Sequence, residues 1–138
     1  AKIIVIKNKD IRDKMSATVA EIKGKPTGFD PFYNAPVVAV VLVDKNFFTS
    51  VYDGSLVIGN MMLAAYSLGL GSCWVHYAKE EFELPEYKGL LNSLGIQGDW
   101  EGVGHCVFGY VDGPVPEALP RKENRVYLVD NAFCKEGR

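Results

Sequence analysis

The chain has 138 residues, of which 48% are hydrophobic, and its 15 basic residues nearly balance 17 acidic ones, for a net charge of −2. This length predicts a single domain, residues 1–138, with a true hydrophobic core. The balanced charge argues against binding to nucleic acid or to an anionic membrane. No apolar run reaches the ~18 residues that a membrane-spanning helix needs.

The three cysteines are Cys73, Cys106 and Cys134, and no two of them form a close pair in the sequence. This usage favours reduced, buried thiols in a cytoplasmic protein. A zinc site would have to draw on Cys73, His76, His105 and Cys106. Because adjacent residues of a strand point to opposite faces, the last two are poorly placed to share a metal, and we expect none.

The first third of the chain reads as strand, helix, loop and strand. Residues 1–7 alternate and predict a buried strand. Asp10 then opens an amphipathic helix with Ile11, Met15, Val19 and Ile22 on one side, and "KGKP" at 23–26 ends it. The aromatic loop 27–36 needs a surface to pack on, provided by the chain, a ligand or a second subunit. The β-branched run 37–44 predicts a strand covered on both faces.

The middle of the chain predicts a long helix. Ser50 or Asp53 can cap it, it runs to Leu68, and Gly69 suits a left-handed stop. Its apolar residues occur almost all round, so we expect burial on most sides, as a central helix or between two subunits. Asn60, in its middle, would then satisfy a buried or interfacial backbone group.

The remaining elements are shorter. We expect a strand at 72–77, a polar, broken helix at 80–94 with Pro85 near its start, and a strand at 102–111. A surface loop then leads to a last strand at 126–129 and a polar, frayed tail to residue 138. Strands mixed with helices predict a layered α+β or α/β domain.

The sequence contains no familiar catalytic motif: no G-x-S-x-G, no H-E-x-x-H and no phosphate-binding Walker loop. His105 lies among apolar neighbours, and such a histidine is more often a satisfied core residue than a catalytic one. If the chain is an enzyme, a bound cofactor therefore carries the reaction.

Four stretches together resemble the nitroreductase family of FMN-dependent oxidoreductases. They are "FYNAPVVAVVLVDK", "DGSLVIGNMMLAAYSLGLGSCWVHY", "GVGHCVFGYVDG" and "PRK". They occur in the family's order, with similar spacing, from about Phe29 to Val129. The resemblance implies an α+β fold in which helices flank a mixed sheet, and a homodimer with the buried helix at its interface and FMN between the subunits.

The resemblance also implies an activity and a site. NAD(P)H would reduce the flavin, which would reduce a nitroaromatic, a quinone or a similar small electron acceptor, so that no side chain need be catalytic. The main chain of Trp74, Val75, His76 and Tyr77 would face the flavin N5 edge, and Arg121 and Lys122 would hold the FMN phosphate. Gly69 and Gly71 would allow the tight approach, and Trp74, Tyr77, Phe32 and Tyr33 would supply apolar walls. The plainer alternatives are a capped helix followed by a core strand, and a solvated basic loop.

The chain departs from the family pattern at its start. The family's amino-terminal segment, with an arginine-rich phosphate motif, would precede Ala1. A fragment is the favoured explanation, the others being a partner that supplies the missing part and a shortened relative that binds flavin weakly or not at all. Two competing functions remain: a non-catalytic flavin-binding member of the same fold, and a purely structural dimerisation module.

Overall fold

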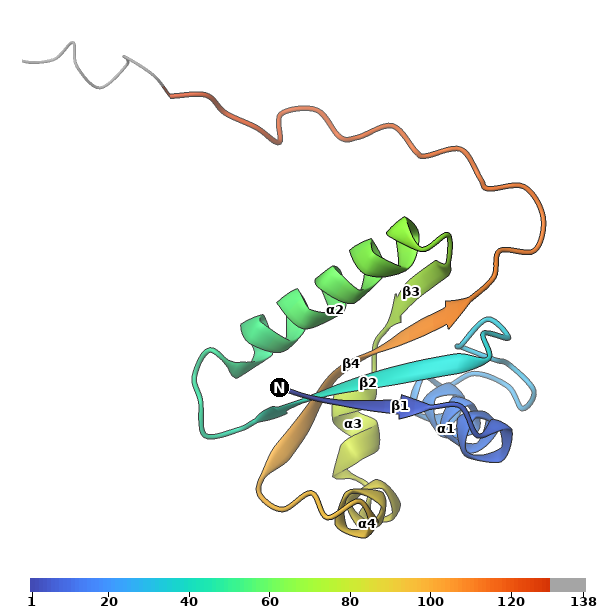
Figure 1. Ribbon diagram of the computed structural model, residues 1–138, viewed down its shortest axis with the longest axis vertical. Coiled ribbons are helices and arrows are strands. Elements are labelled where there is room, and N and C mark those ends of the chain that lie inside the picture. Colours follow the sequence, from blue (N-terminus) through green and yellow to red (C-terminus); the bar gives the residue numbers. More distant parts are fainter. Residues whose placement is uncertain (130–138) are drawn as a thin grey trace, which may run out of the picture.

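The computed structural model describes residues 1–129 (Figure 1). In chain order, its elements are β1 (Lys2–Ile6), α1 (Lys9–Ile22), β2 (Val37–Asp44), α2 (Ser50–Ser67), β3 (Gly71–Val75), α3 (Ala78–Glu83), α4 (Pro85–Ser93) and β4 (Trp100–Gly109). The predicted polar tail and Cys134 lie outside the described residues. Among residues 1–129, no helix combines the length and apolar character needed to cross a membrane.

The four strands form one sheet in the order β1-β2-β4-β3. Helix α2 lies on one face, and α1, α3 and α4 lie on the other (Figure 1). This arrangement confirms the α+β class. All three strand pairs in the described part are antiparallel, whereas the resemblance implied a mixed sheet. The connections β1–α1–β2 and β3–α3–α4–β4 reverse the direction of the chain, whereas β2 and β3, joined through α2, run the same way on either side of β4.

Strand β2 is covered on both faces, as its β-branched run predicted. Val38, Val40 and Leu42 belong to the core beneath α1, α3 and α4. The alternate residues Ala39 and Val41 pack with Ile58 of α2. All of them are at most 2% exposed, so β2 is the centre of both cores.

A β-bulge changes the alternation of side chains along β4. Val41 pairs with Gly104 and Leu42 with Gly102, which leaves Val103 as the extra residue. Val103 packs in the α2 core, and a Cβ at Gly104 would also meet the α2 residue Ile58. On the other side, a Cβ at Gly102 would overlap Ala78 of α3. After the bulge, His105 faces the α3 side of the sheet, where Phe32 contacts it.

The predicted helices are confirmed, with adjusted ends. Helix α1 is capped by Asn8, whose Oδ1 accepts a hydrogen bond of 3.0 Å from the Ile11 amide, so Asp10 lies inside the helix. Helix α2 ends as predicted, because Gly69 is left-handed (φ +73°) and the Leu70 amide donates to the Ala65 carbonyl. The polar helix is broken before Pro85 into α3 and α4.

Two predictions of burial are wrong for the single chain. Strand β1 is an edge strand, and Ile3 and Val5 are 49% and 59% exposed because α2 does not cover this end of the sheet. Helix α2 buries only its sheet-facing residues, Ser50, Gly54, Ile58 and Ala65. Asn60 is exposed, so within one chain it satisfies no buried backbone group.

The predicted last strand is also wrong. Residues 126–129 are exposed and have no regular secondary structure, like the rest of the segment 110–129. Figure 1 shows this segment leaving the end of β4 and extending away from the sheet. A strand needs a hydrogen-bonded neighbour, and these residues pair with neither edge of the sheet, β1 or β3.

Candidate functional site

The predicted contact segment Trp74–Tyr77 joins the end of β3 to the start of α3. Val75 is buried at 8% exposure, whereas His76 is exposed and its ring contacts Tyr77 edge-on at a centroid distance of 5.3 Å. Tyr77 adopts a left-handed backbone (φ +77°), which is uncommon for a residue with a side chain. The chain therefore comes to the surface at His76 and Tyr77, between the buried Val75 and Ala78, and we call residues 75–77 the ledge.

Trp74 turns away from this ledge and packs on the other face of the sheet. A Cβ on Gly104 would lie 2.4 Å from its Nε1, so the indole covers the bare backbone of that glycine. Trp74 is half-buried against the α2 core. Phe32, a predicted apolar wall, is fully buried. In the single chain, Tyr77 and Tyr33 remain as aromatic side chains with exposed surface near β3.

His105 is a satisfied core residue, as predicted. It is fully buried, its Nδ1 lies 3.3 Å from the Val75 carbonyl oxygen, and its Nε2 lies 2.6 Å from Oε2 of Glu81. Glu81 is equally buried, and no group in the described residues hydrogen-bonds its Oε1. Glu81 was not predicted, because "KEEFE" offers three glutamates with no signal for which one turns inward.

Tyr87 of α4 lies next to this pair. Burial raises the pKa of Tyr87, its hydrogen bond with Thr18 opposes this shift, and the nearby Glu81 carboxyl adds to it. The hydroxyl donates a bond of 2.9 Å to Thr18 Oγ1. Polar groups of α4, α3 and β4 therefore lie close together in an otherwise apolar core, and the half-buried Thr18 of α1 bonds Tyr87 at its edge.

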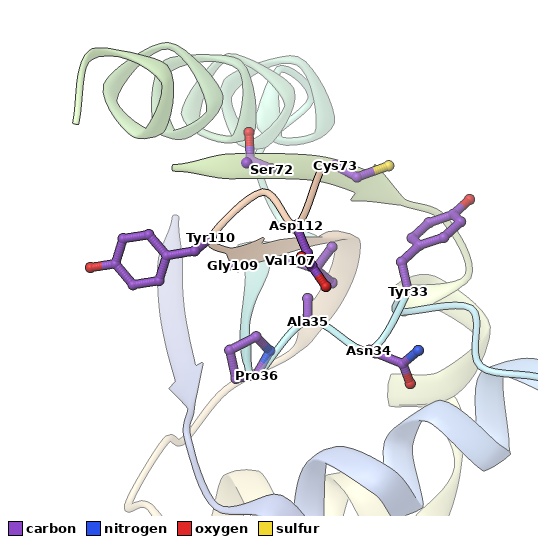
Figure 2. A pocket seen from close by; sticks show the side chains of 11 residues that line it. Tyr33, Asn34, Ala35, Pro36, Ser72, Cys73, Val107, Gly109, Tyr110 and Asp112 are labelled. Atoms are coloured by element: carbon purple, nitrogen blue, oxygen red, sulfur yellow. The ribbon is translucent and has the colours of Figure 1, made fainter. Parts of the chain in front are cut away.

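A cavity of about 660 Å³ opens beside the start of β3 (Figure 2). The loop before β2 forms one wall with Tyr33, Asn34 and Pro36, and Ser72 and Cys73 of β3 form the opposite one. The end of β4, at Gly109 and Tyr110, completes it. This cavity was not predicted, because it depends on the spacing of three segments that are distant in the sequence.

Asp30 fixes the loop that forms one wall of the cavity. Its carboxylate accepts hydrogen bonds from Arg12 (2.5 Å), Ser16 (2.6 Å) and the amides of Phe32 and Asn34 (2.8 Å each). Burial opposes ionisation, but these bonds prevail and lower the pKa of Asp30. They hold Tyr33 and Asn34 in left-handed conformations, with φ of 55° and 57°.

The two cysteines that the structure describes are reduced. Burial, with a smaller contribution from Cys73, raises the pKa of the Cys106 thiol to about 11. Cys106 is therefore an inert core residue, whereas Cys73 is only half-buried and lines the cavity. In residues 1–129, no three histidine, cysteine or acidic side chains are grouped so that they could hold a metal ion.

The structure does not bring the predicted basic residues to the ledge. Arg121 and Lys122 are exposed in the segment 110–129, which Figure 1 shows running away from the sheet. Within one chain, residues Trp74–Tyr77 follow one another at the end of β3, whereas Arg121 and Lys122 lie in a different part of the structure.

Comparison with known proteins decides the family. A sequence model of the nitroreductase family matches residues 1–110 of this chain. The chain belongs to the nitroreductase family. A search of curated proteins found no match.

Solved structures show the same fold as this nitroreductase-family chain. A nitroreductase with bound FMN from Bacteroides fragilis NCTC 9343 shares 23% identity, with a TM-score of 0.81, over 94% of this chain and 75% of that one. A nitroreductase family protein from Clostridium difficile 630 is 30% identical over 92% of this chain and 69% of its own, with a TM-score of 0.57. Iodotyrosine deiodinase, bound to FMN and 3-iodo-L-tyrosine, is 20% identical over 94% and 76%, with a TM-score of 0.61.

Proposed function

We propose that this nitroreductase-family chain is an FMN-dependent oxidoreductase. The observation that carries the proposal is the exposed His76 of the ledge, which lies at the surface between the buried Val75 and the left-handed Tyr77. A segment sealed in the core would have excluded any flat ring from this place. The family match and the FMN-bound structures of the same fold support the same conclusion.

The ledge, together with the main chain of Trp74 before it, suits one edge of a flavin. Trp74, Val75, His76 and Tyr77 would hold it through main-chain groups, which orient a ring without adding an acid that competes for protons. When bound, FMN supplies the redox chemistry by accepting and passing on a hydride. The chain's own task is then to bind and orient the ring and to exclude water from it, and the apolar part of Tyr77 suits that task.

Arg121 and Lys122 are the proposed phosphate contacts. Charge-assisted hydrogen bonds from such side chains to a phosphate are strong. Because the segment 110–129 extends away from its own sheet (Figure 1), we propose that the two cations act on FMN shared with a second copy of the chain. NAD(P)H would be the reductant and a nitroaromatic, a quinone or a similar small molecule the acceptor, in the cytoplasm.

The outer face of α2 supports the proposed homodimer. Tyr52, Leu56, Leu63 and Tyr66 are between 68% and 85% exposed there. Such a large apolar surface on one helix is typical of a protein–protein interface. We propose that a second copy covers it, so that α2 is buried on most sides only in the dimer.

Adding FMN to the purified protein and recording the visible spectrum tests the proposal. We expect a bound flavin, and NAD(P)H oxidation that depends on a quinone or a nitroaromatic. A protein that takes up FMN without such turnover would be the non-catalytic alternative. A dimer that takes up no FMN would be a structural module, and would overturn the proposal.

The basic segment offers a matched pair of variants. R121A should weaken FMN binding about tenfold or more, because a charge-assisted bond to phosphate is lost. R125A, four residues further along the same exposed segment, should leave the affinity unchanged. Equal affinities for R121A, R125A and the wild-type protein would remove Arg121 from the proposed site.

A further inference from the structure

A ring of hydrogen bonds lies on the buried side of the ledge. His105 bonds the Val75 carbonyl at 3.3 Å and the Glu81 carboxyl at 2.6 Å. The backbone amide of Glu81 in turn donates a bond of 3.0 Å to the Tyr77 carbonyl. We call this ring the Glu81–His105 clamp. Its two ends are the carbonyls of residues 75 and 77, and His76 lies between them.

The hydrogen-bonding capacity of each partner limits where the protons of His105 and Glu81 can lie. A carbonyl oxygen only accepts, so His105 Nδ1 must carry a proton toward Val75. The contact of Nε2 with Glu81 then needs one more proton between the two atoms, on either side. Both arrangements, imidazolium with carboxylate or imidazole with carboxylic acid, leave the pair neutral as a whole. A neutral pair is the form that a fully buried site accommodates at least cost.

Stability alone gives no reason for this pair. It lies among Phe32, Phe82 and Tyr87 in the larger core, where apolar residues of similar volume are often as stabilising as a buried ion pair. The fold nevertheless makes room for it. A Cβ at Gly102 would lie 2.2 Å from the Ala78 carbonyl, so the first turn of α3 rests directly on the backbone of β4. This close approach brings Glu81 within reach of His105.

We propose that Glu81 and His105 are positioning residues for the cofactor: they hold the backbone of residues 75–77 in the conformation that presents His76 to FMN. This inference rests on the proposed function. The left-handed Tyr77 supports it, because a backbone of this kind persists only where its surroundings hold it. The clamp bonds the residues on both sides of His76.

The test compares the double variant E81L/H105L with E81Q. The leucine pair keeps the core apolar and filled but leaves the Val75 carbonyl without its imidazole donor. In E81Q, the amide can donate to Nε2 while Nδ1 still donates to Val75. Two readouts are needed: the dissociation constant of FMN from a fluorescence titration, and the ¹⁵N resonance of FMN labelled at N5, which reports hydrogen bonding at that atom.

We expect E81L/H105L to bind FMN about tenfold more weakly or worse, with the N5 resonance moved toward that of free FMN, and E81Q to retain most of the wild-type values. V19A, a truncation in the same core away from the ledge, controls for lost stability and should change neither readout. A folded double variant with wild-type affinity and resonance overturns the inference.

Two further measurements separate the possible failures. If E81L/H105L does not fold, H105Q replaces it, because a single amide nitrogen cannot face both Glu81 and Val75, and an unmoved N5 resonance would again overturn the inference. If the wild-type protein binds no FMN, the proposed function is wrong, whatever the clamp does. Amide exchange at residues 76 and 77 of the protein without FMN still tests the clamp, because it should speed up in the double variant.

Discussion

Asp30 is the residue on which the loop before β2 depends. Four donors converge on its carboxylate, from α1 through Arg12 and Ser16 and from the loop itself through two amides. Arg12 also donates a bond of 3.0 Å to the Ala35 carbonyl, so it ties the loop to α1 at Asp30 and again at Ala35. The cavity wall with its left-handed Tyr33 and Asn34 is therefore held by the hydrogen bonds of Asp30 as well as by the packing of the fully buried Phe32 in the core.

D30N should lower the free energy of unfolding at neutral pH by about 1.5–3 kcal/mol, because an amide cannot accept all four bonds. The lowered pKa of Asp30 sets the pH dependence. Its contribution is fully present above the unfolded value of 3.8 and is lost as the pH falls through the folded value. Denaturation followed from about pH 5 down to about pH 2 should show a shallower loss of stability on acidification in D30N than in the wild-type protein. D10N, at an exposed carboxylate of the same helix, should have little effect.

At the residue level, the sequence predicted His105 but not its partner. A histidine in an apolar strand was expected to be satisfied, and it is. Glu80, Glu81 and Glu83 are equivalent in the sequence, and only the rotation of α3 against β4 decides that Glu81 is buried. Similarly, Asp30 stands in a loop sequence that gives no sign of its four partners. The residues that would contact the cofactor came from family resemblance and not from pattern.

Helix α2 lies close to the sheet at Gly54, which has no side chain. A Cβ at Gly54 would lie 2.6 Å from Val103 and 2.8 Å from Val43, so the helix packs almost directly on the sheet there. Gly59, five residues further along, has no such neighbour within 4 Å. The two glycines of one helix thus have opposite surroundings.

G54A should therefore destabilise the protein by about 1–3 kcal/mol, because the added methyl group overpacks the smaller core. G59A should stabilise it by up to about 1 kcal/mol, because alanine favours the helix more than glycine does. Urea denaturation of both variants measures the difference. Equal effects would show that α2 does not pack on the sheet through Gly54.

The elements themselves were largely predictable, because each carries a local signal. Helix period marks α1 and α2, Gly69 marks the end of α2, and Pro85 marks the break between α3 and α4. The bulge at Val103 was not predictable, since it depends on pairing with β2. The exposure of β1 and the missing strand at 126–129 were also missed, because burial and strand pairing depend on neighbours that no local pattern specifies.

At the scale of the whole molecule, the two faces of the sheet are unequally covered. The core on the side of α1, α3 and α4 contains 13 buried residues, against six on the α2 side. Exposed apolar residues remain on the α2 side of the molecule, including Leu56 and Leu63 of the helix and Ile3 and Val5 of β1. The thinner side is therefore where a second copy would complete the core.

L63D tests this arrangement. A carboxylate at the centre of the outer α2 face cannot be buried in an interface at low cost, so we expect the variant to sediment as a monomer where the wild-type protein sediments as a dimer. L94D places the same charge at an exposed leucine on the α4 side of the sheet and should leave the mass unchanged. If L63D remained dimeric, the interface would have to lie elsewhere.

The unequal cores also predict an order in which the two sides of the sheet become stable during folding. The thicker side can consolidate from one chain alone, because its helices and the central strand bury each other fully. In the proposed dimer, helix α2 would gain its last stabilisation only on meeting a second copy, so assembly would come late and would depend on concentration. In dilute solution, the amides of α2 would then exchange with solvent before those of β2.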